Sequence, residues 1–546
     1  MSQITISAAC ELDHRSVWLR GGKSLRVGTS GQTIVANDRG KDCGQTGSKT
    51  HCKNSRFGVR ALHRYHGGMR RLLLSLLLVF SAFCRAAGLP DLGEAAQGEF
   101  SPLLEQKIGA SIIQDIRARE PSYVDDAEIT GYLNRIGGKL GAQSDGATQS
   151  FEFFALRDPT LNAFAMPGGY IGVHTALILS SQTESELASV LAHEISHVTQ
   201  RHLARLINKS GQGQAASLLS LAVAILAARS NPDIAMGAVM AGQGVAIQNQ
   251  LNYSRDFERE ADRIGIQLLE RSGYDIRGMA SFFERLQKFG RLYENNAPGY
   301  LRTHPLTTER IADMDNRIHG RPYKQVPDSV EFLLVKAKLR AQSGTPHDAL
   351  TDFQTQLKDK KYTNEAVLRY GLAQAKLLLK DFTGAEREVS EIRRLKLVSP
   401  MIETLSAELR IKQGDPAAAV KILTAARSRY PQERAVTYLL VAAMHDANLA
   451  AEALAVTNED LVSYPSDDRM HILQAKSFAL LGQRAEQHRA LGEAYSLQGQ
   501  LPAAIIQFEL AQKAGDGNFY AQSQIDARLR ELKKQQLEAL KEKKGF

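Results

Sequence analysis

The feature that most constrains the fold is a 34-residue period in the C-terminal part of the chain, from about residue 330 onward. Stepping by 34 residues aligns Lys380, Gly414, Asn448 and Gly482. Alanines recur in register with these positions, at Ala373, Ala385, Ala407, Ala419, Ala426, Ala453 and Ala475. Small side chains at fixed positions allow two helices to approach closely, so the period predicts a stack of paired helices.

The length of this period and the placement of its alanines resemble tetratricopeptide repeats, which form an α-solenoid. We therefore expect a tetratricopeptide-repeat domain over residues 328–540. At 546 residues the chain is too long for this domain alone, so a different kind of domain must precede it.

The N-terminal region differs from the rest of the chain. Residues 1–68 show no clear helical or strand period. Met69-Arg70-Arg71 then leads into the apolar run 72–83, and the small residues Ala86, Ala87 and Gly88 follow. A basic start, a short apolar run and a small-residue exit are typical of a secretory signal peptide. We expect a signal peptide over 69–87; residues 1–68 would be either a spurious N-terminal extension or a genuine disordered basic arm.

The positive charge of the chain is concentrated in this leader. The formal net charge is +9, but without residues 1–87 the chain has 54 basic and 55 acidic residues. A nearly neutral protein gives no reason to expect a nucleic-acid partner. All four cysteines, Cys10, Cys43, Cys52 and Cys84, also precede residue 88. The exported chain would therefore lack disulfides and cysteine-bound metal.

The middle of the chain mixes helices with a few strands. Three- and four-residue spacing predicts helices within 100–140, and alternation predicts a strand at 151–156. The turn Pro167-Gly168-Gly169 predicts two further strands on either side of it, at 162–166 and 170–174. Further helices are expected at about 183–207, 254–272 and 276–290. Thr183 and Glu186 form a capping box at the start of the first of these three. The apolar segment 208–250 predicts a helical hairpin over the core; a mobile lid or a membrane-contacting element is the alternative.

The helix at 183–207 carries the motif His193-Glu194-Ile195-Ser196-His197. Residues four apart share one helix face, so both imidazoles can bind one metal ion. Glu194 is placed to act as a general base on a metal-activated water and to pass the proton to the leaving amine. The pattern predicts a zinc-dependent endopeptidase with one Zn2+ per chain.

A catalytic zinc needs a third protein ligand. Glu258 and Asp262 are again four residues apart on a predicted helix, so Glu258 could bind the metal while Asp262 hydrogen-bonds a ligand imidazole. Taken alone, this segment could equally be an acidic, solvated helix face.

The motif at 193–197, Glu258 with Asp262, the segment 162–169, and His304-Pro305 ahead of Arg310 together resemble the zinc peptidases of the HtpX and CAAX prenyl protease family, in particular its periplasmic members with tetratricopeptide repeats. The resemblance implies a zincin-like metallopeptidase domain over 95–322 and a mostly α fold with a small β-sheet. It also implies that Glu258 is the third ligand, that His304 can cap the zinc in a self-inhibited state, and that Arg310 lies near the scissile carbonyl.

The resemblance further implies that an edge strand pairs with an extended substrate; this strand comprises Asn162, Ala163, Phe164, Ala165 and Met166. From the residues alone, His304 could be a loop histidine, and Arg310 could form a salt bridge instead of stabilising an oxyanion. His174 and His202 are expected to be structural or to hydrogen-bond a ligand.

The signal peptide and the zinc motif predict an exported protease, and the resemblance implies that it acts in the periplasm, where it degrades misfolded or stalled envelope and outer-membrane proteins and assists their assembly. By resemblance, the repeats would bind the β-barrel assembly complex, and peripheral membrane contact is an open alternative. One rival function is a chaperone or adaptor that acts through its repeats with a latent protease site. Another is an integral membrane protease, although no apolar run after the leader reaches about 18 residues.

Overall fold

The structure is a computed structural model that describes residues 100–144, 149–210, 255–292 and 299–544. The expected signal peptide, the extension before it, all four cysteines and residues 211–250 of the apolar segment lie outside the described residues.

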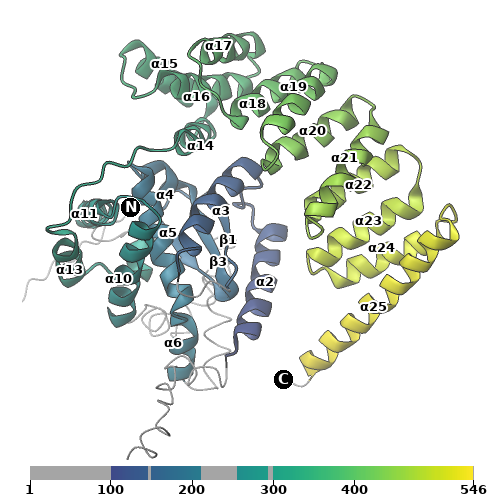
Figure 1. Ribbon diagram of the computed structural model, residues 1–546, viewed down its shortest axis with the longest axis horizontal. Coiled ribbons are helices and arrows are strands. Elements are labelled where there is room, and N and C mark those ends of the chain that lie inside the picture. The colour runs from purple at the N-terminus through teal and green to yellow at the C-terminus, as the bar shows by residue number, and fades with distance from the viewer. Residues whose placement is uncertain (1–99, 145–148, 211–254, 293–298, 545–546) are drawn as a thin grey trace, which may run out of the picture. The chain divides into compact units, whose positions relative to one another are not determined.

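The N-terminal part of the described chain is built from helices around one small sheet (Figure 1). Its helices are α2 Pro102–Arg119, α3 Ala127–Gly141, η2 Pro167–Gly169, α4 Thr175–Ser180, α5 Glu184–Thr199, α6 His202–Ser210, α10 Arg255–Arg271, α11 Arg277–Leu292, α12 Gly299–Thr303 and α13 Thr308–Ile318. Its strands are β1 Glu152–Leu156, β2 Ala163–Ala165 and β3 Tyr170–His174.

The three strands form a mixed sheet in the order β1-β3-β2. β1 pairs with β3 in parallel, and β2 pairs with β3 antiparallel, with Phe164 opposite Gly172. A Cβ at Gly172 would lie 2.3 Å from the Phe164 ring, so only glycine fits there. The three predicted strands therefore exist, and β2 lies at an edge of the sheet.

Helix α5 is the central element of this part, and every residue from Glu184 to Val198 is buried. It packs against α3, α10, α11 and β2. The Thr183 hydroxyl caps its start by accepting from the Glu186 amide at 3.2 Å. The Glu186 carboxylate reaches back to the amide of Gln182 instead of that of Thr183, at 2.5 Å. The predicted capping residues therefore cap the helix with a small change of partner.

The predicted helix at 183–207 is two helices, not one. It breaks between α5 and α6 because Arg201 adopts a left-handed conformation with φ of 50°. No glycine marks this break in the sequence, so the apolar period alone could not reveal it.

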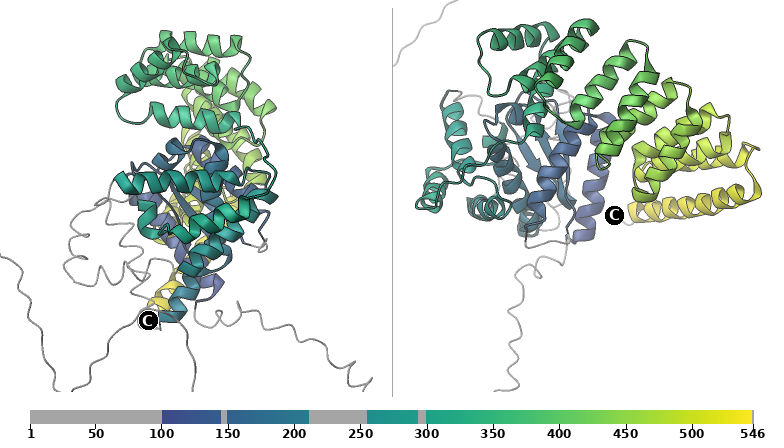
Figure 2. Two further views of the ribbon diagram at one scale, coloured as in Figure 1. Left: turned by 90° about the vertical axis from the view of Figure 1, so that its left-hand side faces the viewer. Right: turned by 45° about the horizontal axis from the view of Figure 1, so that its top comes forward.

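The C-terminal part consists of consecutive paired helices (Figures 1 and 2). They are α14 Val330–Ala341, α15 Pro346–Lys358, α16 Glu365–Leu378, α17 Phe382–Arg394, α18 Pro400–Lys412, α19 Pro416–Arg429, α20 Arg434–Asp446, α21 Ala450–Ser463, α22 Asp468–Leu480, α23 Arg484–Leu497, α24 Leu501–Lys513 and α25 Phe519–Lys544.

The 34-residue period has a direct structural basis. The aligned positions Lys380, Gly414, Asn448 and Gly482 all have positive φ, between 59° and 83°, and each follows the first helix of a pair. The seven alanines in register with them are all at most 3% exposed. The expected fold class, a mostly α chain with a small sheet followed by an α-solenoid, is confirmed.

The hydrophobic core continues from the N-terminal part into the first repeats. Ile136 of α3 and Phe332 of α14 belong to one buried cluster, which extends to Leu405 of α18. A buried ion pair reinforces this contact, because Lys338 Nζ lies 2.6 Å from both Asp126 and Glu128. Within the part of the chain that the structure describes, no helix has the length and hydropathy that a membrane span requires.

Candidate metal centre

The two motif histidines of α5 face each other across a buried site. Their Nε2 atoms are 2.9 Å apart, and neither side chain is more than 2% exposed. Two unprotonated nitrogens this close repel each other unless a cation or a shared proton lies between them. Burial lowers the pKa of His197 to about 3, which keeps its ring neutral and its lone pair available for a metal.

Glu258 and His304 complete a four-residue cluster around these histidines. Glu258, from α10, places carboxylate oxygens 3.5 Å from His193 Nε2 and 3.4 Å from His197 Nε2. His304 follows α12, and its Nδ1 lies 3.0 Å from Glu258 Oε1. One ligand atom from each of the four residues lies within 4.8 Å of the others. A buried set of three imidazoles and one carboxylate matches the ligands of a four-coordinate zinc ion.

Opposing charges around Glu258 determine its protonation. Burial alone would raise its pKa, but His304, His193 and His197 outweigh that effect and hold the pKa well below its ordinary value. The carboxylate is therefore ionised, as a metal ligand must be.

Glu194 is fully buried next to the cluster. Its Oε1 lies 3.5 Å from His304 Nε2, and neither carboxylate oxygen has a hydrogen-bond partner of good geometry among the described residues. Burial raises the pKa of Glu194, partly opposed by His304 and His193. A carboxylate with a raised pKa and free lone pairs can take up a proton and later release it.

Asp262 and Arg310 support the cluster from behind. Asp262 Oδ1 lies 2.9 Å from His193 Nδ1, the nitrogen that faces away from the cluster. Arg310 donates to both Asp262 oxygens, at 2.7 and 2.8 Å. Its Nη1 reaches Glu258 at 2.7 Å and the carbonyl of Pro305 at 2.9 Å. The guanidinium is 2% exposed and engaged on every side, which favours the salt-bridge alternative; an oxyanion role remains a prediction that requires some of these contacts to break.

The segment that carries His304 is tied to the start of the edge strand. The backbone amide of Tyr300 donates to the carbonyl of Leu161 at 2.9 Å, and the His304 amide donates to the carbonyl of Tyr300 at 2.7 Å. The rings of Tyr300 and His304 stack with centroids 4.7 Å apart. Tyr300 could not be predicted from the sequence, because its neighbouring residues do not distinguish it from an ordinary core tyrosine.

The two further histidines differ in their distance from the cluster. His202 is buried, and its Nδ1 lies 2.8 Å from His197 Nδ1. His174 lies at the end of β3, where its Nδ1 is 3.3 Å from Asp158 and 3.1 Å from the Thr160 hydroxyl. Neither belongs to the four-residue cluster. That each is structural or hydrogen-bonds a ligand stays a prediction.

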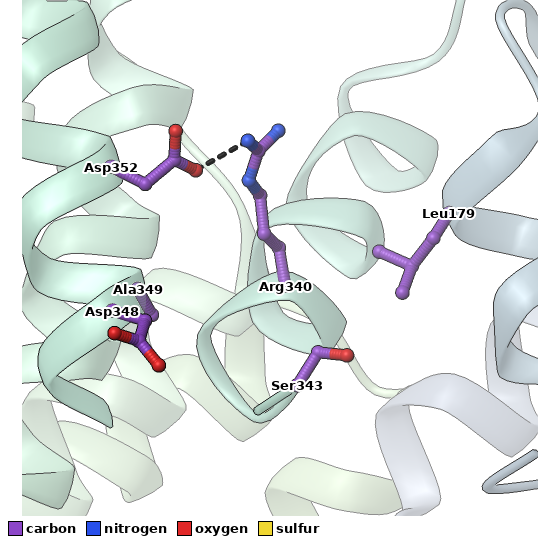
Figure 3. Close-up of a pocket in the computed structure, with 6 residues that line it drawn as sticks. All are labelled: Leu179, Arg340, Ser343, Asp348, Ala349 and Asp352. Atoms are coloured by element: carbon purple, nitrogen blue, oxygen red, sulfur yellow. Dashed lines mark ion pairs between the residues drawn. The ribbon is translucent and has the colours of Figure 1, made fainter. Parts of the chain in front are cut away.

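The larger surface hollows lie away from this centre. One cavity of about 340 Å³ is lined by Leu179 of α4 and by residues of α14, α15 and the turn between them, among them Arg340 and Asp352, which form an ion pair (Figure 3). At the centre itself, the hollow beside Ala165 and His197 has a volume of only about 10 Å³. The metal cluster is therefore enclosed in this conformation.

Comparisons with known proteins place this geometry in a family. The sequence pattern of Peptidase family M48 matches residues 128–318, which contain all four cluster residues, and that of the tetratricopeptide repeat matches residues 410–477.

Two curated relatives match more than four fifths of the chain, and a third matches 37% of it. The beta-barrel assembly-enhancing protease of Yersinia pestis is 30% identical over 473 residues, 85% of this chain and 97% of the relative. Its counterpart in Escherichia coli K12 is 30% identical over 461 residues, 84% of this chain and 94% of the relative. A mitochondrial metalloendopeptidase of Arabidopsis thaliana is 31% identical over 204 residues, 37% of this chain and 39% of the relative. The chain therefore belongs to Peptidase family M48 and is a metalloendopeptidase with C-terminal tetratricopeptide repeats.

Proposed function

We propose that this metalloendopeptidase uses zinc and acts in the periplasm, where it degrades misfolded or stalled envelope and outer-membrane proteins and assists their assembly. Its catalytic domain would span 95–322 and its repeat domain 328–540, after a signal peptide at 69–87. The observation that carries the proposal is the buried group of His193, His197 and Glu258 with Glu194 beside it.

In this proposal His193, His197 and Glu258 hold the zinc ion, and Asp262 fixes the ring of His193. A bound zinc ion would supply Lewis-acid activation of water and of the substrate carbonyl. The carboxylate of Glu194 takes the proton from the attacking water and delivers it to the leaving amine. Its raised pKa suits it to hold that proton between the two steps.

An extended substrate would pair with β2. Among the described residues this strand pairs with β3 alone, and Ala165 lines the small hollow beside His197. Backbone pairing with the edge strand would align a peptide bond with the centre without demanding a particular side chain. A protease that cleaves misfolded proteins must accept many different substrate side chains, and backbone pairing allows this.

His304 would hold the enzyme in a resting state. Its ring occupies the remaining side of the cluster, between Glu258 and Glu194, where a water or substrate would otherwise bind. Because its segment is hydrogen-bonded through Tyr300 to Leu161, displacing His304 would also free the approach to β2. One movement would thus open the zinc site and the strand edge.

The repeats would bring clients or an assembly machine to the protease. Tetratricopeptide repeats commonly present curved surfaces to proteins or peptides, and the names of the full-length relatives refer to β-barrel assembly. The β-barrel assembly complex is the partner that we propose for this chain.

A second candidate function is a chaperone or adaptor whose protease site is mostly latent. The enclosed centre, with His304 at 1% exposure, favours a role in which cleavage is the exception. The two functions differ in whether proton transfer by Glu194 is needed in cells.

The Glu194→Gln variant tests the proposal. It keeps the size of the side chain and leaves the metal ligands intact, so zinc content should not change, while cleavage of unfolded casein should fall about 10²- to 10⁴-fold. Glu309→Gln is the matched control, because Glu309 is exposed on α13 and should leave cleavage unchanged. Full casein cleavage by Glu194→Gln would overturn the mechanism, and full rescue of a deletion strain by that variant would favour the chaperone function.

A further inference from the structure

The break between α5 and α6 is an unusual feature beside the metal centre. The amide of Gln200 bonds to the carbonyl of Ser196 at 3.0 Å, and the amide of Arg201 bonds to that of Val198 at 2.9 Å, which closes α5. The residue after the C-cap of such a helix adopts a left-handed conformation, and this position is normally a glycine because a Cβ makes the conformation strained. Here Arg201 adopts it, with φ of 50°.

The side chain of Arg201 holds this turn in place. Its Nη2 donates to the carbonyl of Phe100 and to Glu105 Oε1, both at 2.6 Å, and its Nε donates to the same oxygen at 3.0 Å. Glu105 belongs to α2 and is itself buried. An arginine at this position thus offsets the backbone strain with contacts that glycine could not make.

The break brings two histidine rings together. On a continuous helix, residues five apart point about 140° away from each other. Here the rings of His197 and His202 have centroids 4.8 Å apart, and their Nδ1 atoms are 2.8 Å apart. His202 is 0% exposed and stacks on Phe257 with an interplanar angle of 10°.

The hydrogen bonds around these rings are consistent with one arrangement of protons when a metal is bound. Nε2 of His197 faces the cluster, so coordination leaves the proton on Nδ1, which donates to Nδ1 of His202. The proton of His202 then lies on Nε2 and is donated to Glu260 Oε2 at 3.2 Å. Arg205 donates to the same oxygen at 2.9 Å and keeps the carboxylate in place.

We propose that His202 and Glu260 are positioning residues for the metal ligand His197. This proposal rests on the zinc site of the proposed function and adds residues that the motif does not contain. The Asp262 carboxylate contacts His193 directly, whereas the His202 ring lies between His197 and the carboxylate of Glu260. The chain from His197 through His202 to Glu260 fixes the ring orientation and the tautomer that exposes the Nε2 lone pair, and partners of this kind raise metal affinity.

His202 does not serve as a further metal ligand in this arrangement. Its Nδ1 points at the outward-facing nitrogen of His197, and its Nε2 points at Glu260. Glu260 is about one-third exposed, so its removal disturbs the core less than removal of His202.

Two replacements of His202 separate positioning from packing. His202→Phe keeps a ring on Phe257 but removes the acceptor, while His202→Asn keeps an acceptor near the Nδ1 position but fills the site poorly. We expect His202→Phe to weaken zinc binding about 10- to 100-fold, measured by competition with a chromophoric chelator. His202→Asn should bind zinc more tightly than His202→Phe although its metal-free form melts at a lower temperature. A purely structural role predicts the same order for affinity and for melting temperature.

Two further variants complete the experiment. Glu260→Ala should weaken zinc binding roughly 10-fold, at the lower end of the range for such partners. His445→Phe is the matched control, because it makes the same replacement at a buried histidine in the repeats, 2.8 Å from the Ser477 hydroxyl, and should leave zinc affinity unchanged. Affinities of His202→Phe and Glu260→Ala within twofold of the wild type would overturn the positioning role.

The same measurements distinguish this inference from the proposed function. A wild-type protein that binds no zinc contradicts the zinc site itself and the positioning role with it. A wild-type protein that binds zinc, beside a His202→Phe variant of equal affinity, contradicts only the positioning role. In a cobalt-substituted protein, loss of one nitrogen ligand on replacing His202 would instead identify it as a direct ligand and contradict the role proposed here.

Discussion

At the scale of single residues, the metal centre is a group of charged side chains that are buried together. Glu258, Asp262 and Arg310 are each at most 2% exposed and lie in direct contact. The motif predicted His193, Glu194 and His197 from local spacing alone. The predicted roles of Glu258, His304 and Arg310 depended on the family resemblance. Local sequence spacing cannot show that these residues, which are distant from the motif along the chain, lie beside it in the fold.

His304→Ala tests whether this residue restrains the enzyme. Removing the ring opens the fourth side of the cluster while three ligands remain, so casein cleavage should rise roughly 3- to 10-fold as the open state becomes more populated. His319→Ala is the matched control, because it replaces an exposed histidine at the end of α13 and should leave casein cleavage unchanged. Unchanged cleavage in His304→Ala would contradict the self-inhibition proposal.

Arg310→Met tests how much the buried arginine stabilises the metal-free protein. The substitution leaves Asp262 and Glu258 without their main cationic partner, so the free energy of unfolding in urea should fall by about 3–5 kcal/mol. Arg263→Met, on α10, breaks the half-exposed pair with Asp313 and should cost less than about 1 kcal/mol. If Arg310→Met and Arg263→Met lowered the free energy of unfolding equally, the burial of the Arg310 ion pairs would add nothing to stability.

At the scale of elements, periodic features were predictable and local breaks were not. The repeat period aligned Lys380, Gly414, Asn448 and Gly482, and the structure places all four at the turn between the helices of a pair, because each pair reverses at the same point. The strands at 151–156, 162–166 and 170–174 followed from alternation and the Pro-Gly-Gly turn. The break at Arg201 was missed because tertiary contacts of its side chain, made with residues about a hundred positions away, determine its backbone conformation.

The tight helix crossings of the repeats give a prediction at this scale. Ala453 is 0% exposed on α21, so Ala453→Leu overfills the crossing and should lower the free energy of unfolding by about 1–3 kcal/mol. Ala451→Leu, two residues away on the exposed face of the same helix, should change it by less than about 0.5 kcal/mol. Chemical denaturation followed by circular dichroism measures both, and equal effects would contradict the close packing.

At the scale of the whole described molecule, the protease and the repeats share a core and a partly buried cluster of charged side chains. Asp126, Glu128 and Glu408 lie around the ammonium of Lys338 where α3 meets α18, and Arg469 and Lys412 add positive charge nearby. Burial, with Glu128 and Asp126 nearby, raises the pKa of Glu408 to about 7 against the pull of Lys338. The ionisation of Glu408 therefore makes the stability of the contact between the protease and the repeats depend on pH.

The sign of that pH dependence follows from the raised pKa. Between about pH 4.5 and 7 the folded state binds more protons at Glu408 than the unfolded state does, so stability falls as the pH rises through this range. Glu408→Gln removes the charge, and it should raise the melting temperature more at pH 8 than at pH 5. Calorimetry at the two pH values measures the difference, and an equal effect at both would contradict the assignment.

The most direct test of the zinc protease is metal analysis of the chain from residue 88, paired with casein cleavage before and after chelation. We expect one zinc per chain, loss of cleavage when the metal is removed, and recovery when zinc is restored. Cleavage that persists in the metal-free protein, or a purified chain that binds no metal at the His193–His197 site, would contradict the function proposed here.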